Sequence, residues 1–116
     1  MKVKLLKVVK TPPTSNQKYI AEFELLKEDG KSKKIKRVGF GAKGYRDFTL
    51  MNQKGNKHYI EDKRKRNEVK ASYRKRHEKD LETKNPLRAG YLSYYLLWNK
   101  PTLGASIADY KKKFRV

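Results

Sequence analysis

The side chains of this chain that can act chemically are mostly cations. Lysine and arginine number 31 against 12 aspartates and glutamates, which gives a formal net charge of +19 on 116 residues. A charge of this size repels itself, so we expect a polyanion to neutralise it: nucleic acid, an anionic membrane surface or acidic protein. The candidate binding residues form three clusters: Lys63, Arg64, Lys65 and Arg66; Arg74, Lys75 and Arg76; Lys111, Lys112 and Lys113.

A glycine-rich segment offers a second kind of anion contact. Gly41, Lys43 and Gly44 form a candidate anion-binding turn, because unhindered backbone N–H groups can approach a phosphate. The segment lacks the lysine-hydroxyl ending of a P-loop and the spacing of a dinucleotide fingerprint. The alternative interpretation is a strand exit in which the glycines permit a tight bend.

Residues for catalysis and metal binding are sparse. The chain has no cysteine, which excludes disulfides, thiolate ligands and cysteine nucleophiles. His58 and His77 are too far apart for a short metal motif and stand among cations. No Ser-His-acid spacing, Walker motif or pair of catalytic acids is recognisable. We therefore expect a protein that is not an enzyme, with no cofactor, no metal site and no small-molecule substrate.

The N-terminal third predicts an antiparallel sheet of about three strands. Residues 3–9 are rich in β-branched side chains, and residues 18–26 alternate between apolar and polar positions. The Asp29-Gly30 pair separates that run from residues 33–40, a pattern typical of a β-hairpin whose turn needs positive φ.

The segment after the sheet contains alternating apolar and polar residues. This alternation predicts that Tyr45, Phe48 and Leu50 return to the core while Asp47 and Thr49 face solvent.

Two helical regions complete the predicted α+β fold. Residues 58–80 are highly charged with a thin apolar stripe, which indicates a basic helix that is mostly exposed. A solvated charged helix without a partner is the alternative there. Asn85-Pro86 is a typical helix start, and Thr102 caps a second helix, giving a helical hairpin over residues 85–114.

The hairpin carries an aromatic stripe at helical spacing that includes Tyr91, Tyr94 and Trp98. We expect these rings to lie in the core; stacking on unpaired bases is the alternative. The sequence thus predicts one small domain, residues 1–116, with a β-rich part over 2–50. The longest apolar stretch, residues 92–98, is far shorter than the roughly 20 residues that span a bilayer, so we expect no transmembrane segment.

Three segments together resemble a family of short basic proteins encoded by nucleocytoplasmic large DNA viruses of the giant and algal type. Phe-Gly-Ala-Lys-Gly begins at Phe40, a basic Arg-His segment follows at residues 73–77, and Ala89-Gly90 precedes Leu-Trp-Asn-Lys-Pro-Thr at residues 97–102. The resemblance covers about residues 40–114. It departs where Tyr94-Tyr95 replaces a more Trp-rich version. Because the family's activity is poorly defined, it implies no catalytic residues.

The resemblance implies a structural protein of the virion, made in the host cytoplasm or nucleus. The preferred role is a basic minor capsid or cement protein on the inner side of the capsid. It would bridge major and minor capsid proteins or the internal membrane, with its uncharged aromatic helices docking on neighbours. The alternative is a virion protein that binds DNA without sequence specificity and neutralises the packaged genome.

Overall fold

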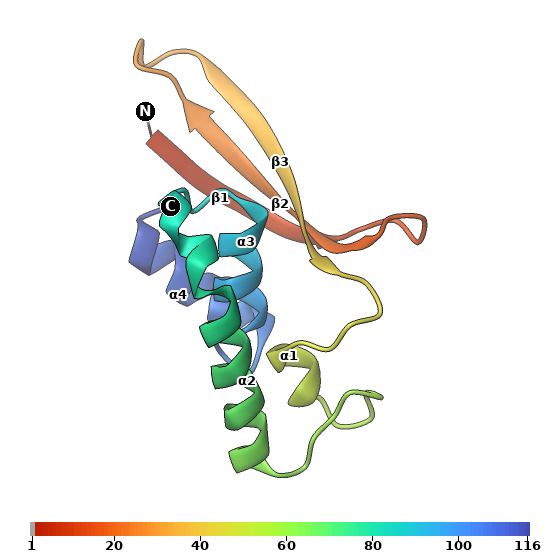
Figure 1. Ribbon diagram of the computed structural model, residues 1–116. Helices are drawn as coiled ribbons and strands as arrows, with labels where there is room; N and C mark the ends of the chain where they lie inside the picture. The colour runs from red at the N-terminus through yellow and green to blue at the C-terminus, as the bar shows by residue number, and fades with distance from the viewer. Residues whose placement is uncertain (1) are drawn as a thin grey trace.

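A three-stranded antiparallel sheet forms the N-terminal part of the protein in the computed structural model, which describes residues 2–116. The strands β1 (Lys2–Lys10), β2 (Gln17–Leu26) and β3 (Lys33–Ala42) lie side by side in chain order. The helices follow the sheet in the chain and pack below it as drawn in Figure 1. The predicted α+β class, with three N-terminal strands, is confirmed.

The β2–β3 hairpin has the predicted turn. Gly30 has a φ of +71°, which a residue with a side chain rarely adopts. The Asp29 carboxylate accepts hydrogen bonds from the backbone N–H groups of Lys31 and Ser32, both at 2.8 Å. The turn chemistry therefore sets the register, in which Phe23 lies opposite Leu5 on one side and Lys36 on the other.

The two faces of the sheet differ in burial. The inner face carries Leu5, Phe23 and Phe40, each at most 2% exposed, and these side chains begin the core. The outer face carries Val9 and Ile35, which are 40% and 41% exposed. This alternation follows from the two-residue period of a strand with one buried face.

The helical part consists of six short elements. In chain order they are α1 (Phe48–Met51), α2 (Lys63–His77), the 3₁₀ helix η1 (Glu78–Thr83), α3 (Ala89–Leu92), the π-helical turn η2 (Ser93–Leu97) and α4 (Leu103–Phe114). Within residues 2–116 no helix combines the length and the apolar character needed to cross a membrane.

Two predicted helix starts are wrong, and one cap is confirmed. The basic helix begins at Lys63 because Asp62 caps it, its side chain accepting the Arg64 N–H at 2.9 Å. Asn85 caps no helix; its side chain accepts the Leu87 N–H within a turn, and α3 begins only at Ala89. The side chain of Thr102 caps α4 as predicted, accepting from Ala105 N at 3.2 Å.

The segment after β3 differs most from the prediction. Asp47 and Thr49 are 1% and 2% exposed, whereas Tyr45 is 72% exposed. The alternation predicted from a strand fails because Asp47 caps α1, accepting the Leu50 N–H at 3.0 Å, and the chain turns into a helix. Phe48 is buried as predicted.

The uncharged run of α3 and η2 forms the centre of the core. Leu92 and Leu96 are fully buried, and Tyr91, Tyr94 and Trp98 are between 6% and 9% exposed. The C-terminal helix packs on this run, and its Tyr110 donates a hydrogen bond of 2.6 Å to the Pro86 carbonyl. The aromatic stripe therefore lies inside the protein.

We predict that Trp98→Ala lowers the free energy of unfolding by about 3–5 kcal/mol, because it leaves a cavity against the Tyr73 ring. Urea denaturation measures the change. Tyr45→Ala is the control: its ring is exposed, so we expect a change below about 0.5 kcal/mol. A Trp98→Ala protein as stable as the parent would contradict the placement of this ring in the core.

Candidate functional site

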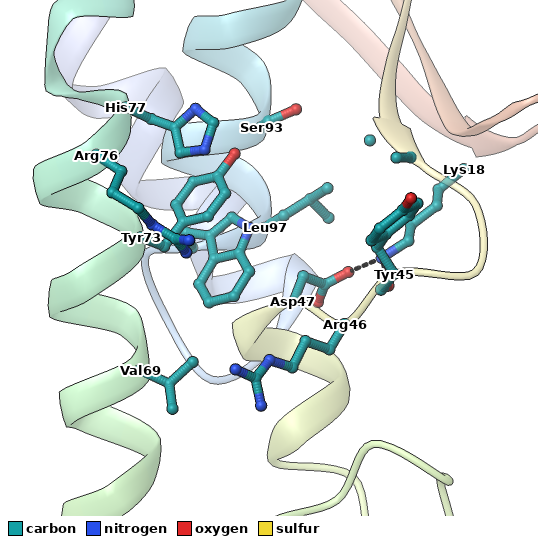
Figure 2. Close-up of a pocket in the computed structure, with 13 residues that line it drawn as sticks. Lys18, Tyr45, Arg46, Asp47, Val69, Tyr73, Arg76, His77, Ser93 and Leu97 are labelled. Atoms are coloured by element: carbon teal, nitrogen blue, oxygen red, sulfur yellow. Dashed lines mark hydrogen bonds and ion pairs between the residues drawn. The ribbon is translucent and has the colours of Figure 1, made fainter.

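A cleft lies between α2 and the loop that joins β3 to α1 (Figure 2). Its volume is about 470 Å³, which lies within the usual range of ligand sites. One wall comes from α2, the opposite wall from the β3–α1 loop, and the floor from η2 and the residue after it. The α2 wall consists of Val69, Tyr73, Arg76 and His77. The opposite wall consists of Gly41 at the end of β3 and of Tyr45, Arg46 and Asp47 in the loop. The floor consists of Ser93, Leu97 and Trp98.

Three stacked rings line one side of the cleft. The ring of Tyr73 lies 4.1 Å from that of Trp98 at an interplanar angle of 7°, and 4.1 Å from that of His77 at 22°. Burial raises the pKa of Tyr73 to about 12, so its hydroxyl stays protonated at neutral pH. Tyr73 therefore lies between Trp98 and His77, with a ring stacked on each of its two faces.

Two cations of α2 fix the chain that follows η2. The Arg74 guanidinium donates to the Trp98 carbonyl at 2.9 Å and lies 4.1 Å from the centre of the Tyr94 ring. Lys70 donates to the Asn99 carbonyl at 3.1 Å. Burial, and then the nearby Arg74 and Lys100, lower the pKa of Lys70. These contacts anchor α2 to the core.

A buried ion pair fixes the opposite wall. Lys18 of β2 donates to the Asp47 carboxylate and to the Tyr45 carbonyl, both at 2.6 Å. The side chains of Lys18 and Asp47 are only 12% and 2% exposed. The pair therefore holds the backbone that carries Tyr45 and Arg46 at the cleft.

The cleft is positively charged. Arg46 and Arg76 reach it from opposite walls (Figure 2). Among the described residues that line it, Asp47 is the only acid, and Lys18 already neutralises it. Guanidinium groups bind phosphate and carboxylate oxygens well, so the cleft is chemically suited to an anion with a planar part.

The first predicted cluster, Lys63–Arg66, forms the start of α2 and serves two purposes. Arg66 donates to the carbonyls of Ile60 and Glu61, at 2.6 and 3.0 Å, and so holds the chain before the helix. Arg64 lies 3.7 Å from Glu68 in an exposed pair. Lys63 and Lys65 are exposed.

The other two clusters also combine exposed cations with cations that contact other parts of the protein. Arg76 lines the cleft and Lys75 is exposed, whereas Arg74 makes the internal contacts described above. Lys111, Lys112 and Lys113 end α4, and the Lys113 ammonium lies 5.2 Å from the centre of the Tyr95 ring. Of the ten predicted cations, only Arg76 lines the cleft.

The glycine-rich turn contributes Gly41 to the cleft. Gly41 has a φ of +78°, and a Cβ there would lie 2.8 Å from a methyl group of Leu97. The bend and this close approach explain the glycine. Lys43 donates to the Pro12 carbonyl at 2.7 Å, and Gly44, with a φ of +85°, lies in an exposed turn.

Several residues of the site were missed by the sequence analysis. Asp47 followed by a short apolar segment is a helix N-cap pattern that could have been recognised. No pattern links Lys18, Arg46 and Arg76, which come from β2, a loop and α2. Within residues 2–116, no group of three His, Asp or Glu side chains is placed to hold a metal ion.

No protein-family model, curated protein or solved structure matches this chain. The resemblance to short basic proteins of large DNA viruses therefore stays a prediction.

We predict that Asp47→Ala lowers the free energy of unfolding by about 3 kcal/mol, because it removes the α1 cap and leaves Lys18 without its partner. Lys18→Met should lower the free energy of unfolding less in the Asp47→Ala protein than in the parent. The difference, which is the coupling energy between the two sites, should be about 1–3 kcal/mol. Chemical denaturation of the four proteins measures this coupling.

The exposed Arg64–Glu68 pair is the control, because solvent screens it and it should couple weakly. Additive effects of the Lys18 and Asp47 changes would show that this pair does not hold the loop.

Proposed function

We propose that the protein binds nucleic acid through phosphate contacts, without reading base sequence. The observation that carries the proposal is the set of exposed cations on α2 beside the charged cleft. Lys63, Lys65 and Lys75 form no ion pair with any acid among residues 2–116, and Arg76 extends this surface into the cleft. Such cations release condensed counterions when they meet phosphates, which supplies non-specific affinity.

The burial of the aromatic stripe favours this function over docking through the helical hairpin. The minor capsid hypothesis relies on uncharged aromatic helices that contact neighbours. Tyr91, Tyr94 and Trp98 are instead at most 9% exposed, so their surfaces are already used within the protein. What remains outside is mostly cationic, and it suits a partner that supplies many negative charges.

A minor capsid or cement protein of a virion is the second candidate function. The outer face of the sheet supports it, because Leu6, Val9 and Ile35 are 38–41% exposed there or at its edge, near the lysines of β1. An apolar surface bordered by cations suits an acidic capsid protein or an anionic membrane. In this role the protein would lie on the inner side of the capsid.

Two charge-reversal variants test where nucleic acid binds. The first carries Lys63→Glu, Lys65→Glu and Lys75→Glu on α2, and it spares Arg66 and Arg74 because they hold the fold. The control reverses Lys27, Lys31 and Lys34, which lie at the tip of the β2–β3 hairpin, away from α2 (Figure 1). Both variants have the same net charge, so only the location differs.

We expect the α2 variant to bind random-sequence duplex DNA at least tenfold more weakly than the control variant. Its plot of log affinity against log salt should also be shallower, by about one unit for each lost phosphate contact. Fluorescence anisotropy over a salt series measures both quantities. Equal losses in the two variants would contradict the assignment to α2, and absence of salt-dependent binding by the parent would contradict the function.

Fractionation of purified virions separates the two candidate functions. Loss of the protein with the nuclease-digested genome is the result expected for genome binding. Retention with the shell after nuclease treatment would support the minor capsid protein instead.

A further inference from the structure

We propose that the cleft takes up one unpaired base of a single-stranded nucleic acid, with Tyr45 stacking on the base and Arg46 and Arg76 contacting the flanking phosphates. This inference rests on the proposed function and adds to it the form of nucleic acid that is preferred. It assigns a role to the one large aromatic side chain that the described structure leaves exposed.

The side chain of Tyr45 is exposed, while its backbone is held in place. Its side chain is 72% exposed, yet its carbonyl accepts a hydrogen bond of 2.6 Å from Lys18, and the next residue but one is the buried Asp47. A ring held in this way loses little backbone freedom when a ligand stacks on it. The structure gives the ring no hydrogen-bonded partner of its own among residues 2–116.

The opposite wall is formed by Tyr73 and His77. The Tyr73 ring lies between those of Trp98 and His77, so both of its faces are covered and the base would stack on Tyr45. Tyr45 lies on the loop side of the cleft and these rings on the α2 side, with Leu97 and Asp47 drawn between them (Figure 2). At about 470 Å³ the cleft has room for a base and its sugar.

The charges are placed for the backbone of a strand. Arg46 approaches from the loop and Arg76 from α2, so a phosphate on each side of the bound base would meet a guanidinium (Figure 2). Aromatic faces combined with cations are the usual means of holding single strands without sequence preference. In a duplex the faces of the bases are already stacked, and using the cleft would require flipping a base out.

Tyr45→Ala tests the inference, with Tyr45→Phe as the matched control that keeps the ring. Binding is measured by anisotropy with a labelled oligothymidylate and with a duplex of the same length. We expect Tyr45→Ala to weaken single-strand binding by about tenfold and to change duplex binding by less than about twofold. Tyr45→Phe should bind both forms as the parent does.

The emission of Trp98 reports occupancy of the cleft directly. It is the only tryptophan of the chain and it lies at the floor of the cleft. We expect oligothymidylate to quench this emission, and the quenching to be lost in Tyr45→Ala.

The outcomes separate this inference from the proposed function. Unchanged single-strand affinity in Tyr45→Ala, or equal losses for single strand and duplex, would overturn the role of the cleft. After either of these results, salt-dependent duplex binding by the parent would still support the proposed function. A parent that binds neither form would overturn both.

Discussion

The fold depends on burying one uncharged run, α3 and η2, against the inner face of the sheet. Leu92 and Leu96 are fully buried there, and Tyr91, Tyr94 and Trp98 surround them. In a chain with 36% hydrophobic residues, this run is where enough apolar surface is available to form a core. The basic helix α2 has no fully buried residue. It joins the core through the Tyr73 ring, which stacks on Trp98, and through Lys70 and Arg74, which bind the carbonyls at the end of the run. The core therefore orients a helix that is too polar to pack by hydrophobic contact alone.

This arrangement divides the cations into two groups. Lys18, Arg66, Lys70 and Arg74 bind carbonyl groups or a buried carboxylate, and they act as structural residues. The exposed lysines of α2, together with Arg76 at the cleft, have no comparable partner within residues 2–116. Most of the net charge of +19 thus stays at the surface, where its mutual repulsion opposes folding. A bound polyanion would relieve that repulsion and would thereby raise the stability of the fold.

The parts of the fold that could be predicted from the sequence are those controlled by local chemistry. The Asp29-Gly30 turn and the Thr102 cap each depend on a few adjacent residues, and the structure contains both. The segment around Asp47 could not be assigned from alternation, because an N-cap followed by one helical turn has the same short pattern as a strand. The cleft was not predictable at all, since its residues come from β2, β3, the β3–α1 loop, α2 and the η2 segment, and only the tertiary fold brings them together. Cation counts likewise do not distinguish Arg74, which binds a carbonyl, from the exposed Lys75 beside it.

The most direct test of this account is an NMR titration of the isotope-labelled protein with a short single-stranded oligonucleotide. The central claim is that nucleic acid binds at the cleft and along α2 rather than on the sheet. We expect the amide shifts to cluster in residues 41–47 and 69–77, the two segments that contain the lining residues of the opposite walls. Shifts confined to the outer face of the sheet, around Val9 and Ile35, would contradict it and would favour that face as the binding surface.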